Sequence, residues 1–197
     1  MANARDLRKK IRSISNTSKI TRTMEMVATA KSKRAQSRIV AMLPYSDKLG
    51  EILRNLRDAG TVEHPLLEDR EPVKRSLLLI VSANRGFCGG YNSHLLSLAE
   101  KWLVQEEAEG REVDIHASGR KGIVRLRFLK RAAAAQYTHF DDRPSFKETE
   151  ELSSEFLRLF LERQVDRVVV ASTRYISASV QTPKITQLLP IEASAAP

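Results

Sequence analysis

The residues with the clearest chemical potential are the cations of the N-terminal segment. Residues 1–38 contain eleven lysine or arginine residues and only two acidic residues, Asp6 and Glu25, so this segment alone carries a charge of +9. The whole chain has the same net charge, so the remainder is neutral overall. Such a one-sided distribution predicts an acidic partner for the segment: nucleic acid, anionic lipid or an acidic protein surface.

A second candidate site is the turn Arg85–Gly90, which has the sequence RGFCGG and follows an apolar stretch. Glycine-rich turns between a strand and a helix hold phosphates in many α/β proteins. This turn matches neither GxGxxG nor the Walker loop, and no acidic residue stands at the right distance to bind a ribose. We therefore expect a tight structural turn whose glycines adopt positive φ. Cys88 is expected to be a small buried residue, because only His94 lies near enough in sequence to activate it.

Signals for catalysis, metal binding or secretion are absent from the sequence. The four histidines lack metal-ligand spacing, and the chain has no GxSxG, HExxH or P-loop motif. No apolar run approaches the roughly 20 residues of a membrane span, and no signal peptide is present. A single cysteine excludes an internal disulfide and fits a reducing compartment. We therefore expect a chain that is not an enzyme by itself, with no cofactor and no metal.

The basic segment belongs to a long helix predicted over residues 1–57. Residues 1–49 contain no glycine, and Pro44, the first proline, is expected to kink or restart the helix. Unbroken, it would be about 80 Å long at about 1.5 Å per residue, and its apolar stripe would need another helix or a ring of subunits. The stripe has the four-and-three spacing of a coiled coil, with a drifting phase. It comprises Leu7, Ile11, Ile14, Ile20, Met24, Val27, Ile39, Met42, Leu49, Leu53 and Leu56.

The rest of the chain predicts a linker over residues 58–75 and an α/β domain over residues 76–197. Strands alternate with helices, which indicates a Rossmann-like parallel sheet with helices on its faces. The expected strands are Ser76–Ser82, Glu112–Ala117, Ala134–Thr138, Val165–Ser172 and an edge strand ending near Leu189. The expected helices are Tyr91–Ala108, Arg120–Arg131 and Ser145–Arg163. The inward residues are predicted to be Leu95, Leu98, Ala99 and Trp102 in the first of these helices, and Leu152, Phe156, Leu159 and Phe160 in the last.

Three ordered segments resemble those of a known family. Ile20–Ala28 reads ITRTMEMVA, Ser82–Asn92 reads SANRGFCGGYN and Tyr175–Pro190 reads YISASVQTPKITQLLP. In this order they resemble the signatures of the γ subunit of F-type ATP synthase, with Asn84 at a position where that family usually has aspartate. The resemblance extends from residue 5 to residue 190.

The resemblance implies a central-stalk subunit that couples rotation of the membrane ring to ATP synthesis in a proton-translocating F-type ATP synthase. The long helix would form half of the shaft within the α and β subunits, and the α/β domain would be the rotor foot beside the ε subunit and the c-ring. The resemblance implies that the α/β ring is contacted by Lys19, Arg22, Met24, Lys31, Lys33 and Arg34. The family turn in the foot comprises Arg85, Gly86, Cys88, Gly89, Gly90 and Asn92.

The resemblance also sets expectations about processing and location. The family signature begins near residue 5 and leaves no room for a cleaved leader, which favours a bacterial protein. Its place would be peripheral, on the cytoplasmic face of the plasma (inner) membrane. The family's C-terminal helix is expected to be missing, because the chain ends shortly after Leu189-Pro190.

Other functions remain open at this stage. The chain could be a truncated, non-rotary paralogue of the family or a basic nucleic-acid-binding module. The first aromatic residue is Tyr45, so no aromatic side chain accompanies the basic residues, which makes nucleic acid the less favoured partner. A nucleotide-dependent enzyme is disfavoured by the turn sequence described above.

Overall fold

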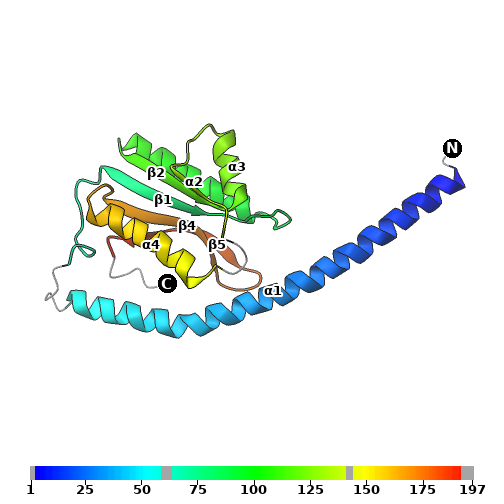
Figure 1. Ribbon diagram of the computed structural model, residues 1–197, viewed down its shortest axis with the longest axis horizontal. Helices are drawn as coiled ribbons and strands as arrows, with labels where there is room; N and C mark the ends of the chain where they lie inside the picture. Colours follow the sequence, from blue (N-terminus) through cyan, green and yellow to red (C-terminus); the bar gives the residue numbers. More distant parts are fainter. Residues whose placement is uncertain (1–2, 59–63, 141–143, 192–197) are drawn as a thin grey trace. The chain divides into compact units, whose positions relative to one another are not determined.

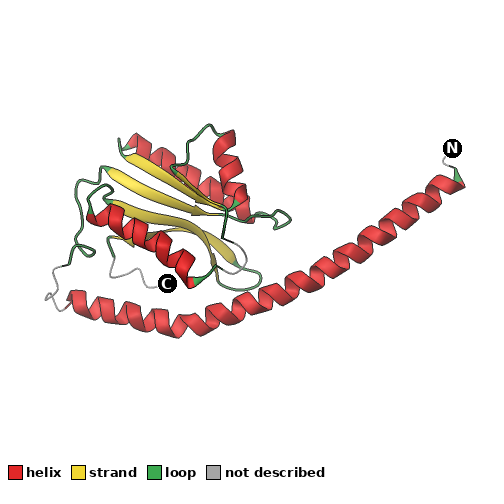
Figure 2. Ribbon diagram, viewed as in Figure 1, coloured by secondary structure: helices red, strands yellow, loops and turns green. Residues whose placement is uncertain are grey.

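The computed structural model describes residues 3–58, 64–140 and 144–191. The chain divides into two compact units, one formed by Met1–Ile52 with Ala196–Pro197 and the other by Leu53–Ala195. Figures 1 and 2 show that a single helix dominates the first unit, whereas the second combines a sheet with helices. We describe each unit separately.

The first unit consists of most of α1 (Ala4–Asp58), a helix of 55 residues. The predicted long helix is therefore confirmed. Pro44 lies inside α1 and does not restart it, and the helix curves gently along its length (Figure 1). A proline inside a helix costs about 3 kcal/mol through one lost hydrogen bond and a ring clash. The good helix formers on both sides, free of glycine up to Gly50, offset that cost.

The second unit contains a five-stranded sheet of order β3-β2-β1-β4-β5. β1 pairs in parallel with both β2 and β4, and β2 pairs in parallel with β3, whereas the edge strand β5 is antiparallel to β4. The predicted α/β class and all five strands are confirmed. The strands are β1 (Arg75–Val81), β2 (Glu112–Ser118), β3 (Ala135–Tyr137), β4 (Arg167–Tyr175) and β5 (Gln181–Leu189). The helices are α2 (Tyr91–Ala108), α3 (Arg120–Phe128) and α4 (Phe146–Leu161).

Two hydrophobic layers cover the two faces of this sheet. Leu78 and Ile80 of β1 belong to the layer that contains α2 and α3, whereas Leu77 and Leu79 belong to the layer that contains α4. Residues 76–80 of β1 are all buried. A central parallel strand needs such a run, because helices pack on both of its faces.

The buried face of α2 differs from the prediction. Leu98 and Trp102 are only half-buried, and the buried face consists of Leu95, Leu96, Ala99, Leu103 and Glu106. A glutamate was not expected inside, but its carboxylate pairs with the guanidinium of Arg167. That guanidinium also donates to Ser76 Oγ at 3.1 Å and lies over the Trp102 ring, 5.4 Å from its centroid. The ion pair turns Glu106 inward and moves Trp102 toward the surface.

In α4, Phe156 and Phe160 are buried as predicted, whereas Leu152 and Leu159 are half-buried. The helix begins with a capping box. Glu148 N donates to Ser145 Oγ at 3.2 Å, and Ser145 N donates to the Glu148 carboxylate at 2.6 Å.

The segment before β1 packs against the α/β unit over its described part, residues 64–74. Leu66 contacts the α4 core layer and accepts a hydrogen bond from Ile191 N at 2.7 Å. Arg70 donates to the carbonyls of Phe160 and Val165 at 2.7 and 3.0 Å, and its guanidinium stacks 3.7 Å from the Phe160 ring centroid. Arg70 thus neutralises part of the negative C-terminal end of α4.

Gly119 lies where two backbone segments of the second unit approach closely. It precedes α3 with φ of 91°, and a Cβ atom there would lie 2.0 Å from the carbonyl oxygen of Ser82. Gly110 also has positive φ, 72°, but a Cβ there would meet no atom within 4 Å.

We expect Gly119→Ala to destabilise the fold by about 3 kcal/mol, because the strained φ and the backbone clash add. Gly110→Ala carries the strain alone and should cost about 1 kcal/mol. Urea unfolding followed by Trp102 fluorescence measures both. Equal losses in the two variants would show that the close approach to Ser82 does not matter.

His116 predicts a pH dependence of stability. It is buried between Tyr137 and Phe156, and its Nδ1 lies 2.9 Å from the Tyr137 hydroxyl. Burial lowers the pKa of His116 below its usual 6.5, although Asp114 and Glu155 act in the opposite direction. The unfolded chain therefore binds this proton more readily. The contribution of neutral His116 is complete above about pH 6.5 and is lost as the pH falls through the lower folded pKa.

We expect His116→Phe to reduce the loss of unfolding free energy between about pH 7.5 and about pH 5.5, because the group that must be neutral in the fold is gone. Urea titrations at the two pH values measure this difference. His94→Gln, at an exposed site on α2, keeps His116 and serves as the control. An unchanged pH dependence in His116→Phe would assign the effect to other groups.

Candidate partner-binding surfaces

The apolar stripe of α1 is exposed. Ile11, Ile14 and Met24 have 66, 68 and 58% of their surface exposed, values far from those of a packed seam. Across the described side chains of α1, no residue falls in the buried class. The stripe is therefore available to a partner helix or subunit.

The predicted ring-contacting residues of α1 lie on two sides of the helix. At 3.6 residues per turn, Lys19, Arg22 and Lys33 share one side, because their spacings of three and eleven residues are close to whole turns. Met24 lies in the apolar stripe on the other side. Lys31 follows at the next stripe position, seven residues after Met24, and Arg34 continues it. All six side chains are exposed.

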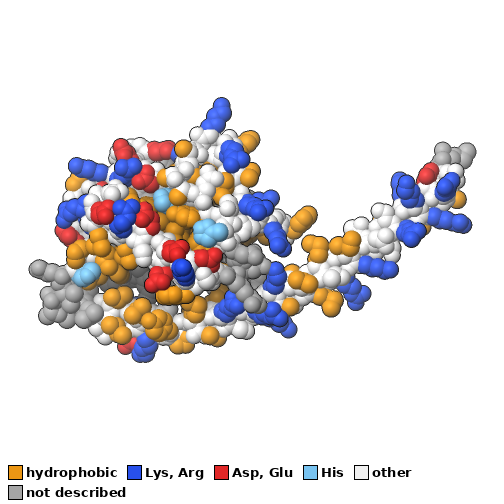
Figure 3. All heavy atoms as spheres, viewed as in Figure 1, with side chains coloured by type: hydrophobic (Ala, Val, Ile, Leu, Met, Phe, Trp, Pro, Cys, Tyr) orange, Lys and Arg blue, Asp and Glu red, His pale blue; other side chains and the backbone are white. Residues whose placement is uncertain are grey.

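Four of these cations have no acidic partner within the described residues. Lys19, Arg22, Lys33 and Arg34 take part in no ion pair there, in contrast to Lys48, which pairs with Glu51 at 2.6 Å. Figure 3 shows lysine and arginine side chains at intervals along α1, with few acidic side chains among them. Their positive field is therefore not neutralised locally and extends toward whatever surface faces the helix.

Hydroxyl groups on α1 are satisfied by the helix itself. Thr17, Thr21 and Thr23 donate to the carbonyls four residues earlier at 3.0, 2.9 and 3.0 Å, and Ser37 does the same at 3.0 Å. The protons of these four hydroxyls are bonded within the helix, so these side chains need no acceptor on a partner that packs against them.

The family turn is held by Asn92 at the start of α2. Its Oδ1 accepts from Ala83 N at 3.0 Å, and its Nδ2 donates to Cys88 Sγ at 3.1 Å. The prediction that Cys88 is buried is wrong. Cys88 is exposed, at the surface end of the turn, where its thiol accepts the hydrogen bond from Asn92. The expectation of positive φ is confirmed for Gly89, at 56°, and is wrong for Gly86 and Gly90; instead Phe87, which is not glycine, adopts φ of 57°. Phe87 is fully exposed.

Arg85 is also exposed, at the near end of the same turn, and Gly86 lies beside the Lys121 side chain of α3. Gly90 is the residue before α2 and lies against the His94 ring. The structure thus brings the predicted turn residues together, whereas the six residues of α1 stay distributed along and around a helix.

The amide groups at the start of α3 are occupied from within the fold. Asn84 Oδ1 accepts from Arg120 N at 3.2 Å, the Ala83 carbonyl accepts from Lys121 N at 3.1 Å, and Ser82 Oγ accepts from Gly122 N at 2.8 Å. These are the donors that a phosphate would use at a helix N-terminus. The start of α3 therefore offers no free amide to a phosphate, whereas the turn Arg85–Gly90 precedes α2 and its structural role stays a prediction.

The sequence analysis did not identify Ser82 and Asn84 as the residues that position the start of α3. Asn84 Nδ2 also donates to the Phe140 carbonyl at 2.9 Å. An aspartate could accept from Arg120 N but could not donate to Phe140. This position does carry a signal in the sequence, namely its departure from the family pattern.

Metal binding and membrane spanning find no support among the described residues. Within residues 3–58, 64–140 and 144–191, no three His, Cys, Asp or Glu side chains are grouped to hold a metal ion. None of the helices described is both long and apolar enough to cross a membrane.

Known proteins match this chain over nearly its whole length. A family model for ATP synthase matches residues 3–196. The ATP synthase gamma chain of Leptospira biflexa is 39% identical over 193 residues, covering 98% of this chain and 67% of the relative. That of Rhodopirellula baltica is 38% identical over 192 residues, covering 97% and 65%. The chain thus spans about two thirds of the length of these curated relatives.

A solved structure with the same fold is the central stalk and c-ring of the Tetrahymena thermophila mitochondrial ATP synthase. It matches with a TM-score of 0.62 and 19% identity, over 87% of this chain and 72% of that chain. The fold is therefore that of a central-stalk protein, a long helix followed by an α/β unit. The sequence matches carry the assignment further: the chain belongs to the ATP synthase gamma chain family. The role they support is that of the gamma subunit of an F-type ATP synthase, which is a non-catalytic subunit.

The exposed stripe predicts self-association of the isolated chain. We expect the 197-residue chain to form dimers or larger species at micromolar concentration, because burying apolar side chains is worth about 25 cal/mol per Å2. Ile20→Glu with Val27→Glu should shift the chain toward monomer. Sedimentation velocity measures the distribution, and a clean monomer of the unaltered chain would refute the expectation.

Proposed function

We propose that this chain couples rotation of a membrane-embedded c-ring to ATP synthesis at the β subunits of a proton-translocating ATP synthase. Within this proposal, residues 1–57 are the shaft helix, 58–75 the linker and 76–197 the rotor foot. Family membership and the central-stalk fold support the proposal. The observation that carries it is the unpaired cationic surface of α1, with Lys19, Arg22, Lys33 and Arg34 exposed.

The proposed partners are the α and β subunits around α1, and the ε subunit and c-ring at the foot. Acidic surfaces on β would face the four cations together with Lys31, and Met24 would add adaptable apolar contact. Exposed ion pairs are worth about 0–1 kcal/mol each. Several weak contacts suit a surface that must slide past its partner at every angle of rotation, whereas one deep anchor would hold it at a single angle.

The family turn contributes to the same proposal from the foot. Arg85, Gly86, Cys88, Gly89, Gly90 and Asn92 form a rigid loop that presents the exposed Phe87 side chain. A fully exposed aromatic residue on a well-braced loop suits a protein contact. The proposed location is the cytoplasmic face of a bacterial plasma (inner) membrane, where the subunit would be peripheral, and the proposed coupled ion is the proton.

The test is assembly with purified α and β subunits from a bacterial relative. We expect the chain to join these subunits. The triple variant Lys19→Glu, Arg22→Glu, Lys33→Glu should bind about tenfold more weakly at low salt, because three attractive contacts become repulsive. The difference should shrink as salt rises, because exposed charges are screened.

The matched control reverses three exposed cations of the α/β unit, Lys101→Glu, Lys147→Glu and Arg174→Glu, with the same change in charge. Native gels at several salt concentrations, with titration of the chain, measure the affinity. If the control weakens assembly as much as the α1 variant does, net charge and not the α1 surface explains the result.

Nucleic acid is the alternative partner that the same basic helix allows. A phosphate-bound segment would lose affinity steeply and linearly in log–log terms as salt rises. Residues 1–44 contain no aromatic side chain to stack on bases, which disfavours this reading. A non-rotary paralogue is the other alternative, and it would assemble with α and β without supporting ATP synthesis.

A further inference from the structure

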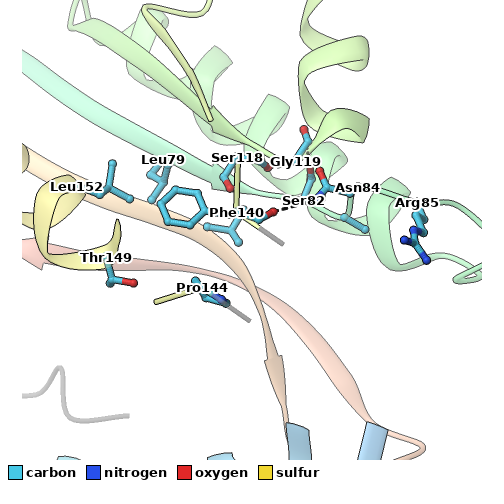
Figure 4. Close-up of a pocket in the computed structure, with 12 residues that line it drawn as sticks. Leu79, Ser82, Asn84, Arg85, Ser118, Gly119, Phe140, Pro144, Thr149 and Leu152 are labelled. Carbon is cyan, nitrogen blue, oxygen red and sulfur yellow. Dashed lines mark hydrogen bonds between the residues drawn. The ribbon is translucent and has the colours of Figure 1, made fainter. Parts of the chain in front are cut away.

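A cavity of about 450 Å3 lies at the carboxyl ends of β1 and β2, on the face of the sheet that α4 covers (Figure 4). Its apolar walls come from Leu79 and Val81 of β1, Leu152 of α4 and Phe140. The residues before α2, Ser82 to Arg85, line another side. This volume falls within the range of roughly 300–1,000 Å3 found for small-molecule sites, and the carboxyl end of a parallel sheet is where such sites form.

Most polar groups around this cavity are already engaged. Ser82 Oγ donates toward the carbonyl of Ser118 at 2.9 Å and accepts from Gly122 N, and both amide atoms of Asn84 are bonded. Thr149 Oγ1 donates to the Ser145 carbonyl at 3.2 Å. With the amides of α3 also occupied, the site offers no cradle for a phosphate group.

Ser118 is the exception. This residue is only 8% exposed, yet its hydroxyl has no hydrogen-bond partner in the part of the chain that the structure describes. Figure 4 shows the hydroxyl directed toward the cavity, near the Phe140 ring. Because this hydroxyl borders the cavity, a ligand atom that accepts or donates one hydrogen bond can pair with it.

Among the described residues that line the cavity, Arg85 is the charged one. Its side chain is exposed, it takes part in no ion pair in the described structure, and Figure 4 shows it at the open side, away from Leu152. The cavity therefore combines an apolar interior, one inner hydroxyl and one outer cation. The Phe140 ring and the aliphatic walls favour a flat, apolar body.

We propose that this cavity binds a small, flat, apolar monoanion of the aromatic carboxylate class. The ring system packs between Phe140 and Leu152, a polar atom of the ligand meets the Ser118 hydroxyl, and the anionic group faces Arg85. The site is separate from the α1 surface and does not depend on the proposed coupling function. All of its lining residues belong to the α/β unit.

The test is titration of the full 197-residue chain with 1-naphthoate, followed by amide and methyl NMR shifts. We expect saturable shifts with a dissociation constant of about 1 mM or below, clustered at Leu79, Ser118 and Leu152. Ser118→Leu fills the cavity and should abolish the shifts. Leu152→Trp fills it from α4 and serves if Ser118→Leu does not fold. Ser153→Leu, at an exposed position on α4, should leave binding unchanged.

The charge is tested separately. Arg85→Gln should weaken 1-naphthoate about two- to fivefold, the effect of one exposed ion pair, and leave uncharged 1-naphthamide unaffected. Shifts that do not saturate, shifts that spread along α1, or binding that survives in a folded cavity-filling variant would overturn the proposal. Equal weakening of both ligands by Arg85→Gln would overturn the anionic preference.

Discussion

A single helix of 55 residues cannot bury its own apolar side chains, and this constraint governs the first unit of the protein. Ile11, Ile14 and Met24 are more than half exposed, and Lys31 and Arg34 interrupt the stripe that they begin. A partner must therefore accept both apolar and cationic groups along the same helix. Four hydroxyls of α1 donate back to the helix, so they need no acceptor on that partner. The result is a surface suited to many contacts of modest strength.

The second unit is cross-linked by hydrogen bonds where its central strands end. The hydroxyl of Ser82 joins the end of β1 to the end of β2 and to the start of α3. Asn92 bonds to the following turn, and Gly119 allows the backbones to approach. Such bonds would suit the proposed role of this unit as the foot of a rotating shaft.

The sequence predicted elements well and side-chain surroundings less well. The strong periodicity of α1 and the apolar run of β1 determined their bounds to within a few residues. In α2 the prediction is confirmed for Leu95 and Ala99 and wrong for Leu98 and Trp102. Glu106 was not foreseen inside because its partner Arg167 lies 61 positions away, and local patterns carry no trace of such a partner. The prediction for Cys88 was wrong because residue type alone does not tell on which side of a turn a small side chain lies, and Cys88 is exposed.

For the candidate sites too, residue character could be predicted, whereas the side-chain surroundings could not. The basic character of α1 and the family turn could be recognised from residues alone, and the family resemblance selected the partner class that charge left open. The side of the helix on which each cation lies follows from the helical repeat. The cavity could not be foreseen, because Leu79, Ser118, Phe140 and Leu152 come from four separate parts of the chain.

The proposed function requires that this chain assembles with α and β subunits, and a mass-spectrometric census of its partners can test that assembly. The tagged chain would be purified from the membranes of its own host, and its intact mass would be compared with the 22.2 kDa of the sequence. We expect α and β subunits to be recovered together with the chain in stoichiometric amounts. Recovery of the chain without either subunit would rule out the proposed assembly.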